Sequence, residues 1–366
     1  MKELCSILAA LERPAARPAA LATLCRVHGS SYRRPGARLL LGGDGARTGS
    51  ISGGCLEDDV ILRARAVAGG GPAEAVTYDT TDENDLVWGV GLGCHGVVDL
   101  VVEPLGGGDP DWAACLRGAL ARRQDAALAV VFQAEATAAL GTRAALTADG
   151  REWAVTGAER AALADGLRGV LANQASHQAR IETLPGRPWV FFEYAPRPAP
   201  LLILGAGDDA QPLCRMAAEL GFAVTVIDPR PAYATKERFP AAETVLVAAP
   251  GVLARRGPAD GRAAAVVMTH HYVHDGPFLR WLLERPPAYI GLLGPKQRAE
   301  KILADLAAGG LEITPVARAR LHAPVGLDLG AQTPETVALA ILAEVQAVLA
   351  GRDARPLRDR TRPIHD

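Results

Sequence analysis

The sequence has no surplus of either charge and no long apolar run. Its 39 basic side chains are balanced by 41 acidic ones, for a formal net charge of -2. Nucleic acids are bound by clustered Lys and Arg in excess, so we expect no nucleic-acid partner. Without a run of about 18 apolar residues, the sequence predicts no membrane span. Residues 1–11 lack the basic-then-apolar order of a secretion signal, and we expect a cytoplasmic protein.

Cysteine is sparse and dispersed. None of the six cysteines belongs to a C-x-x-C pair, which argues against a zinc finger, an iron–sulfur cluster and a redox dithiol. In a reducing compartment, most of them are expected to pack as small apolar side chains. Cys55 and Cys94 differ from the others because each lies in a glycine-rich segment.

A proline cluster divides the chain. Residues 195–200 hold three prolines in six positions, which favours an extended connector because proline continues neither a helix nor a central strand. A chain of 366 residues is long enough for two domains of roughly 150 residues or more. We predict a first domain over 1–195, a linker over 196–200, a second domain over 201–350 and a disordered tail over 351–366.

The second domain has the pattern of an α/β fold. An apolar strand, 201–204, leads through a glycine turn into a helix, and a second apolar strand follows at 223–228, which makes a β-α-β unit. Thr333 before Pro334 predicts the start of a helix that ends near residue 349. Further strand-length apolar runs lie at 244–248, 263–268 and 288–293. We predict a Rossmann-like, doubly wound parallel sheet.

The first domain mixes helices and strands. Helical patterns lie at 1–11, 56–67 and 110–123. Strand patterns lie at 19–28, 37–41, 97–102, 126–132, 143–147, 179–183 and 189–194. We predict an α+β domain.

The first turn of the second domain resembles a dinucleotide-binding turn. Gly205 and Gly207 let the backbone approach a pyrophosphate at a helix N-terminus, and Asp228, about 20 positions later, suits a ribose diol. Asp208 and Asp209, however, put negative charge where a phosphate would lie. These two acids also suit a purely structural role, because they complement the dipole of the helix.

Two later segments also follow predicted strands. Residues 270–275, from His270 to Asp275, hold three His and one Asp, and a metal site, polar contact with a bound cofactor and a loop of satisfied imidazoles are all open. Gly294 precedes Lys296 and Arg298, which suits an anion such as phosphate. A tight turn before a solvated helix face is the alternative.

A glycine-rich loop in the first domain carries a cysteine at a predicted helix start. Gly53 and Gly54 precede Cys55, and Glu57 follows it. A thiol at a helix N-terminus has a lowered pKa and suits a nucleophile, a persulfide carrier or a metal ligand. A buried, inert cysteine is the alternative. Glu57 suits either the helix dipole or the orientation of a ligand.

A second glycine-rich loop also carries a cysteine. Gly93 and Cys94 lie among four glycines in a short segment, whose free N–H groups suit an anion. The two loops would meet on one ligand if the fold brought them together, which spacing alone does not establish.

Six ordered motifs together resemble the XdhC/CoxI family of xanthine dehydrogenase accessory proteins. They are Gly29-Ser-Ser-Tyr-Arg-Arg-Pro-Gly36, Gly49-Ser-Ile-Ser-Gly-Gly-Cys-Leu-Glu57, Gly91-Leu-Gly-Cys-His-Gly96, Gly205-Ala-Gly207, Gly291-Leu-Leu-Gly294 and His322-Ala-Pro-Val-Gly-Leu-Asp-Leu-Gly330. The resemblance implies an XdhC/CoxI-type domain before a Rossmann domain. It also departs from the family pattern, with Asp208 where His is common and Pro295 where Ser is common.

The resemblance further implies a molybdenum cofactor chaperone. Such a protein binds molybdopterin or its cytidine dinucleotide form, supports its sulfuration with a cysteine desulfurase, and delivers it to the apoenzyme of a molybdenum hydroxylase. In this sequence Cys55 and Cys94 would contact the molybdenum. Gly205, Gly207, Asp228 and residues 270–275 would line the nucleotide or pterin end.

Other functions stay open at this point. An NAD(P)-dependent oxidoreductase would explain the second domain but gives the two cysteine loops no role. A protein that only bridges the desulfurase and the hydroxylase would need no cofactor of its own. A homodimer is the default expectation. We favour a chaperone that is not itself a catalyst, with the client enzyme open among several hydroxylases.

Overall fold

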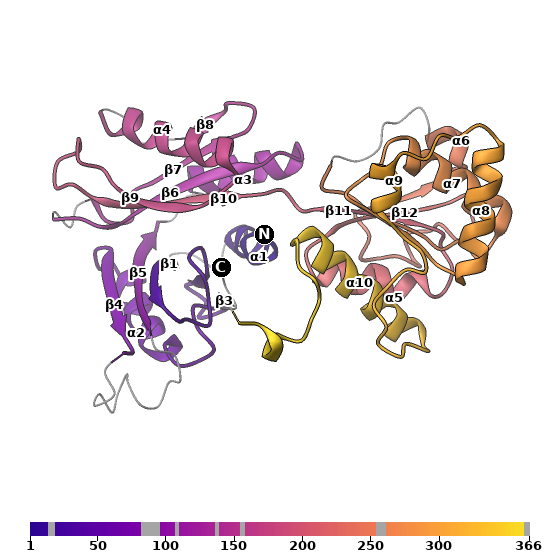
Figure 1. Ribbon diagram of the computed structural model, residues 1–366. Helices are drawn as coiled ribbons and strands as arrows, with labels where there is room; N and C mark the ends of the chain where they lie inside the picture. Colours follow the sequence, from indigo (N-terminus) through magenta and orange to yellow (C-terminus); the bar gives the residue numbers. More distant parts are fainter. Residues whose placement is uncertain are drawn as a thin grey trace. The chain divides into compact units, whose positions relative to one another are not determined.

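The chain forms two compact units in the computed structural model (Figure 1). The first unit is Met1–Arg197 and the second is Pro198–Asp366. The structure describes residues 1–13, 19–81, 96–106, 110–135, 139–153, 158–253 and 261–361. Pro200, the last residue of the predicted linker, is instead the first residue of a strand. The predicted disordered tail contains a short 3-10 helix, Leu357–Asp359.

The first unit contains two antiparallel sheets. The first sheet has the order β3-β2-β1-β5-β4 and the second β8-β7-β6-β10-β9. The strands of the first sheet are β1 (Ala19–Gly29), β2 (Arg38–Leu41), β3 (Arg47–Gly49), β4 (Glu74–Asp79) and β5 (Gly96–Leu105). Those of the second are β6 (Ala126–Gln133), β7 (Arg143–Thr147), β8 (Glu152–Trp153), β9 (His177–Arg180) and β10 (Trp189–Ala195). The helices are α1 (Lys2–Leu11), α2 (Glu57–Ala68), α3 (Asp111–Ala121) and α4 (Ala158–Asn173).

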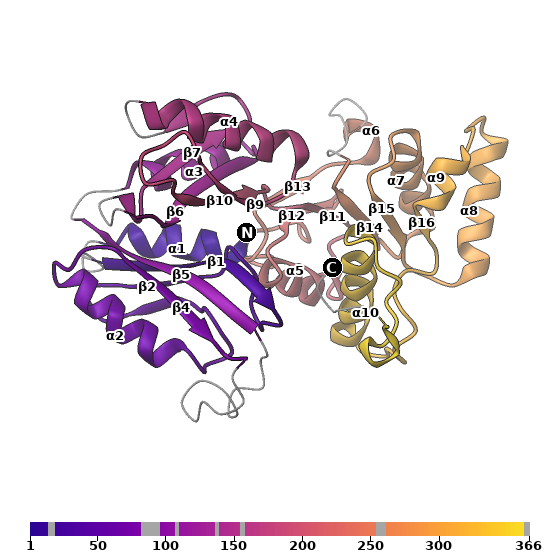
Figure 2. The same ribbon diagram turned by 60° about the vertical axis from the view of Figure 1, so that its left-hand side comes forward.

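The two sheets pack face to face, with a helix on each outer face (Figure 2). Cys25 and Val101 of the first sheet meet Val130, Phe132 and Phe191 of the second in one buried cluster. Helix α2 covers the other face of the first sheet and α4 the other face of the second. Apolar residues therefore alternate along β6 between two cores, which explains why this strand is buried on both faces.

Buried ion pairs tie the two sheets together. Arg143 of β7 pairs with Glu103 of β5 and donates to the Thr23 hydroxyl of β1 at 2.8 Å. Arg38 of β2 donates to Glu193 of β10 at 3.0 Å. Because removing one partner leaves a buried charge unpaired, such pairs fix the relative position of the two sheets within the unit.

The second unit is a six-stranded sheet in which every neighbouring pair is parallel. Its order is β13-β12-β11-β14-β15-β16, the 3-2-1-4-5-6 order of a Rossmann fold. The strands are β11 (Pro200–Leu204), β12 (Ala223–Asp228), β13 (Thr244–Val247), β14 (Ala264–Val267), β15 (Tyr289–Leu292) and β16 (Leu321–His322). The helices are α5 (Ala210–Glu219), α6 (Pro250–Leu253), α7 (Tyr272–Glu284), α8 (Lys296–Ala308), α9 (Pro315–Ala319) and α10 (Pro334–Leu349).

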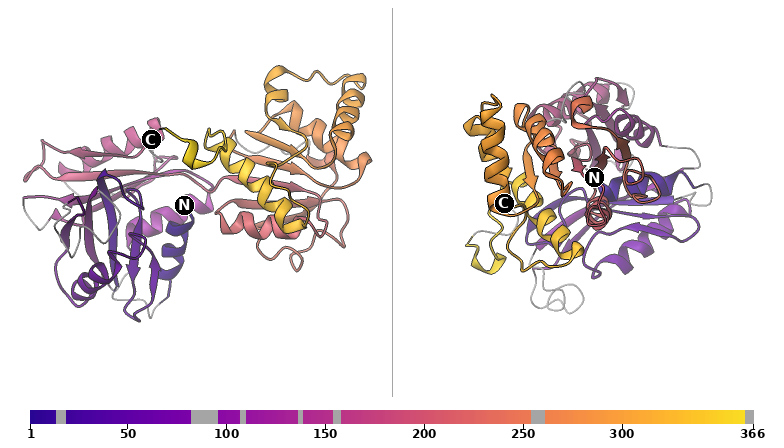
Figure 3. Two further views of the ribbon diagram at one scale, coloured as in Figure 1. Left: turned by 60° about the horizontal axis from the view of Figure 1, so that its bottom comes forward. Right: turned by 90° about the vertical axis from the view of Figure 1, so that its right-hand side faces the viewer.

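Helices cover both faces of this sheet. Figure 3 shows α10 alongside α5, and these two pack on one face, whereas α7, α8 and α9 pack on the other. The predicted α/β fold class, an α+β domain before a doubly wound parallel sheet, is confirmed. No helix in the described part of the chain is both long enough and apolar enough to cross a membrane.

Two short strands that the sequence did not predict, β3 and β4, are held by their neighbours in the sheet. Strand β3 has only three residues, two of them exposed, and it is held by pairing with β2. Strand β4 alternates between buried Val76 and Tyr78 and exposed polar residues, and it pairs with β5 along its length. Hydrogen bonding to a neighbouring strand, rather than local composition, defines both elements.

Candidate functional site

The loop before α2 is braced by Glu57, the first residue of that helix. The Glu57 carboxylate accepts from the backbone N–H of Ile51 at 3.2 Å and of Ser52 at 2.8 Å, and also from the Ser52 hydroxyl. The Ser52 hydroxyl oxygen accepts in turn from the N–H groups of Gly54 and Leu56, each at 3.1 Å. Glu57 is therefore a positioning group for the loop.

The hydrogen bonds also set the ionisation of Glu57. Burial disfavours its charged form, but the Ser52 hydroxyl and the backbone N–H groups outweigh that effect and hold the pKa of the Glu57 carboxyl below its usual value. The brace is consequently ionised at neutral pH.

The braced loop presents an accessible thiol. Cys55 is exposed, whereas Cys25 and Cys214 are buried. The N–H groups of Gly53 and Cys55 have no acceptor among the described residues. Gly54 has φ = 118°, which disfavours any other residue, and a Cβ there would meet nothing within 4 Å. The loop thus places open space and unpaired donors beside a soft sulfur ligand.

Two other segments lie against this region. A Cβ on Gly53 would come within 3.6 Å of the Tyr32 ring, which is 68% exposed. A Cβ on Gly96 would come within 2.2 Å of the Ser30 carbonyl oxygen, so this position has room only for glycine. The loop after β1 therefore touches both the Cys55 loop and the start of β5. Gly93 and Cys94 lie outside the described residues.

In the second unit, the Asp228 carboxylate is fully engaged by its own chain. Its oxygens accept from the Ala206 N–H at 2.8 Å, from the Arg230 N–H at 2.8 Å, and from the Arg230 guanidinium at 2.9 and 2.8 Å. Burial opposes ionisation, but these bonds hold the pKa of Asp228 below its usual value. Asp228 thus fastens the glycine turn to β12 in this structure.

The two acids of the glycine turn are also paired. Asp208 contacts the Arg238 guanidinium at 2.9 Å, and the same guanidinium donates to the Ala206 carbonyl at 3.1 Å. Asp209 contacts His270 Nε2 at 2.6 Å, with His270 held in the left-handed region at φ = 58°. The Asp208 carboxylate is therefore ion-paired, and the Asp209 carboxylate lies against the His270 imidazole.

Gly205 and Gly207 are restricted by these neighbours. A Cβ on Gly205 would lie 2.5 Å from the Met268 carbonyl oxygen, at the end of β14. One on Gly207 would lie 2.6 Å from Asp209 Oδ1. The carboxylate of Asp209 therefore lies next to the backbone that a bound phosphate would approach.

In the 270–275 segment, Asp275 is held by hydrogen bonds within the protein. Asp275 is buried and accepts from the Thr269 hydroxyl at 2.5 Å and from Arg298 of α8. Arg298 was one of the predicted cations beside Gly294, and it is used here instead. Gly294 has φ = 130°, and a Cβ at this position would lie 3.2 Å from the Arg298 side chain. No three His, Cys, Asp or Glu residues of the described part are placed to hold a metal ion.

A network that the sequence did not reveal centres on Glu344 of α10. Its carboxylate contacts His322 Nδ1 at 3.0 Å, the Tyr289 hydroxyl at 2.6 Å and the Gly326 N–H at 2.8 Å. The pKa of Glu344 is lowered because these hydrogen bonds outweigh burial. These bonds fasten the 322–330 segment to α10. In the sequence, a carboxylate at position 344 on the apolar face of that helix is the one sign of such a buried polar contact.

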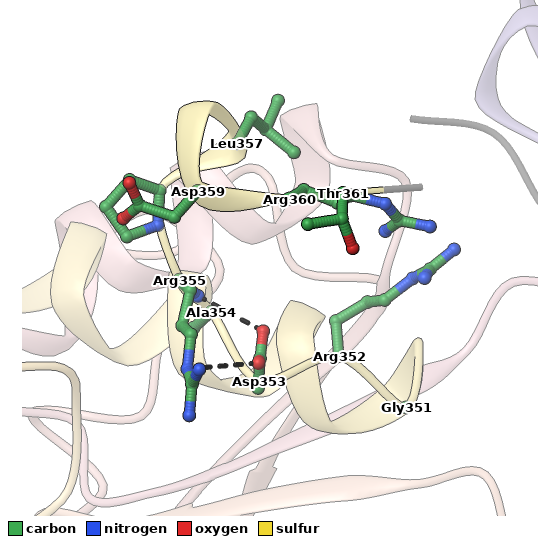
Figure 4. A pocket seen from close by; sticks show the side chains of 10 residues that line it. Gly351, Arg352, Asp353, Ala354, Arg355, Leu357, Asp359, Arg360 and Thr361 are labelled. Carbon is green, nitrogen blue, oxygen red and sulfur yellow. Dashed lines mark hydrogen bonds and ion pairs between the residues drawn. The ribbon is translucent and has the colours of Figure 1, made fainter. Parts of the chain in front are cut away.

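A pocket of about 600 Å³ lies within the C-terminal segment 351–361 (Figure 4). Its charged side chains include an internal ion pair, Arg355 with Asp353 at 3.2 Å. It contains none of the residues predicted to form a site. We therefore assign it no function.

Comparisons with known proteins agree with both units. The model of the XdhC and CoxI family matches residues 13–79, and that of the XdhC Rossmann domain matches residues 201–345. The chain is 34% identical over 330 residues to a probable xanthine dehydrogenase subunit of Bacillus subtilis, covering 89% of this chain and 92% of that protein. It is 26% identical over 335 residues to the molybdenum cofactor insertion chaperone PaoD of Escherichia coli, covering 90% and 83%.

A solved structure matches as well. The crystal structure of a xanthine dehydrogenase from Bacillus halodurans has a TM-score of 0.76 and 28% sequence identity, covering 98% of this chain and 99% of that one. The order of a mixed α+β unit before a Rossmann unit is therefore found in a solved structure. The chain belongs to the XdhC and CoxI family.

Proposed function

We propose that this protein is an accessory protein that holds the molybdenum cofactor and delivers it to the apoenzyme of a xanthine dehydrogenase-type molybdenum hydroxylase. The observation that carries the proposal is the exposed Cys55 thiol on a loop braced by Glu57. Relatives named as a molybdenum cofactor insertion chaperone and as part of a xanthine dehydrogenase support it.

The residues of the first unit suit such a cofactor. The Cys55 sulfur is a soft donor of the kind that suits molybdenum, and the N–H groups of Gly53 and Cys55 are available to an anionic group. When bound, the cofactor would supply a molybdenum centre, and the Cys55 loop would hold it in a position open to a cysteine desulfurase that provides sulfur. Cys94 is proposed as a second sulfur ligand, on the basis of its sequence context alone.

In the second unit, we propose different roles for different residues. Gly205, Gly207, His270 and Gly294 remain proposed contacts for the pterin or nucleotide end. Asp228 is paired with Arg230, and Asp275 with Arg298. We therefore propose that the two aspartates stabilise the loops at the carboxyl edge of the sheet and do not contact the ligand.

The same contacts reduce the support for an NAD(P)-dependent oxidoreductase. A nucleotide ribose would have to compete with Arg230 for Asp228, and a pyrophosphate would face the Asp209 carboxylate. We propose a protein without catalytic turnover of its own. Homodimer formation and a cytoplasmic location stay predictions.

Purification from a host that makes molybdopterin tests this function. We expect the wild-type protein to retain pterin and molybdenum, and Cys55→Ala to lose molybdenum by at least about tenfold. Cys5→Ala, which removes a partly buried thiol elsewhere in the first unit, is the matched control and should behave as wild type. A wild-type protein with no retained or transferable cofactor would contradict the proposal.

A second measurement follows delivery. Activity of a client hydroxylase matured in the presence of Cys55→Ala should fall, while the chaperone variant remains folded. Equal maturation with the variant and the wild type would remove the role of the Cys55 thiol. Tight NADH binding with turnover of a carbonyl compound would favour the oxidoreductase instead.

A further inference from the structure

A second pocket lies beside the Cys55 loop, entirely within the first unit. Its volume is about 370 Å³, and it is bounded by the start of α1, the loop between β1 and β2, and the end of β10. Its lining includes the charged side chains of Glu3, Arg33, Arg34, Arg38 and Glu193 and the aromatic rings of Tyr32 and Tyr194. Three guanidinium groups thus share this pocket with two carboxylates.

Both carboxylates are already paired. Glu3 accepts from Arg33 and, at 2.9 Å, from the backbone N–H of Arg38. Glu193 accepts from the Arg38 guanidinium at 3.0 Å. Arg34 is exposed and forms no ion pair with any described residue, so its positive charge is in excess. The pocket therefore favours an anion.

Arg38 holds one wall of this pocket in place. Its side chain is only 3% exposed, and its guanidinium donates to the Gly36 carbonyl at 2.7 Å and to Glu193 at 3.0 Å. Its charge is therefore used within the protein, and Arg34 is the guanidinium of the pocket that is left for an anion.

Tyr32 connects the pocket with the Cys55 loop. It lines the pocket, contacts Gly53 and leaves much of its ring exposed. Gly53 precedes Cys55 by two residues, a stretch of at most about 7 Å of chain. A planar ring packed on Tyr32 would lie between the cationic pocket and the thiol.

We propose that this pocket binds the phosphate group of a phosphorylated pterin, with the pterin packed on Tyr32 and Arg34 as the main phosphate contact. The identification of the ligand as a pterin rests on the proposed function, whereas the preference of the pocket for an anion does not. The pterin and its phosphate are thereby assigned to the first unit, and the proposed contacts of the second unit are left to the nucleotide end of a dinucleotide form.

The test compares two probes on the full-length protein, a pterin with a phosphate monoester side chain and the same pterin without the phosphate. Both lack molybdenum and a dithiolene, so Cys55 is not required for their binding. Titration followed by pterin fluorescence should show tighter binding of the phosphorylated probe. Arg34→Ala should weaken its binding by about tenfold or more and leave the other probe unchanged.

Control variants separate this effect from unfolding and from general charge. Arg34 makes no ion pair with described residues, so Arg34→Ala should keep the fold. Arg65→Ala removes another exposed arginine of the same unit, outside the pocket, and should bind both probes as wild type. Tyr32→Ala should weaken both probes, and Tyr32→Phe should preserve both.

The outcomes are distinguishable from those of the proposed function. Protein that retains molybdenum cofactor but binds the two probes equally overturns the phosphate pocket and leaves the proposed function intact. Protein that prefers the phosphorylated probe through Arg34, but retains no molybdenum cofactor from a producing host, supports the pocket and overturns the cofactor role. Equal weakening by Arg65→Ala and Arg34→Ala also overturns the pocket.

Discussion

The two turns that precede α2 and α5 are both rich in glycine, but they differ in chemistry. In the first, Glu57 braces the loop from within and leaves the Cys55 thiol exposed. In the second, Asp208 and Asp209 are paired with Arg238 and His270. One turn uses its acid to bind its own backbone, and the acids of the other turn contact side chains from neighbouring segments.

The difference shows what a glycine motif specifies. Both turns need glycine because the backbone adopts positive φ, at Gly54 and at Gly205. At Gly54 the surrounding space is open, whereas Gly205 lies against the backbone of Met268. A side chain therefore has room at Gly54 and none at Gly205.

The largest expected difference is in stability. Gly205→Ala should destabilise the second unit by about 3 kcal/mol or more, because a strained backbone adds to overlap with the Met268 carbonyl. Gly54→Ala should destabilise the first unit by only about 1–2 kcal/mol, since it adds strain without a clash. Urea unfolding followed by hydrogen exchange of peptides from each unit measures both changes. If both variants lost the same free energy of unfolding, the two glycines would not differ in their surroundings as described.

Thiol reactivity should separate Cys55 from the buried cysteines. Burial raises the pKa of Cys25 and raises that of Cys214 to about 11, so at neutral pH almost none of either is thiolate. We expect iodoacetamide to modify Cys55 in the native protein at least about 100-fold faster than Cys214. Mass spectrometry of timed samples gives both rates. In urea the two rates should converge, and a difference that persisted there would show that burial is not the cause.

The smallest expected effect is on pH dependence. Asp228 and Glu57 have lowered pKa values in the folded state, so each contributes stability that is present above its unfolded pKa, near 4, and is lost as pH falls through the lower folded value. Asp228→Asn and Glu57→Gln should each reduce stability at pH 7 by about 1 kcal/mol.

The same two variants test the sign of that effect. Their difference from the wild type should shrink below about pH 4, when the wild-type carboxylates become protonated. Hydrogen exchange of each unit at pH 7 and at acid pH provides the comparison. A difference that grew at low pH would mean that these carboxylates do not stabilise the folded chain through their charge.

Much of the fold could be predicted from local patterns. The apolar runs of the second unit gave its central strands, and Thr333 and Pro334 marked the start of α10, where the Thr333 hydroxyl accepts from the Thr336 N–H. Strands β3 and β4 could not be predicted, because their stability comes from pairing with β2 and β5.

The candidate site was predictable in part. The sequence predicted that Cys55 and Glu57 lie at a helix start, because they stand where the helical pattern begins. It gave no sign that Tyr32, more than twenty positions earlier, lies against Gly53, or that Arg230 occupies Asp228. Those contacts depend on where strands end in space.

The amino-acid sequence by itself determined the two kinds of fold, the glycine turns and the identity of the sulfur and carboxylate groups, because periodicity and residue chemistry are local properties. The tertiary structure alone decided which of these groups are available. Asp228 and Glu57 are both acids beside glycine turns, yet each is already bound by its own chain, whereas Cys55 and Arg34 remain accessible. Availability depends on hydrogen bonds and packing that form only in the folded chain. Arg230 and Ser52 are close in sequence to Asp228 and Glu57, but they meet these carboxylates only in the backbone conformation that the folded turns adopt.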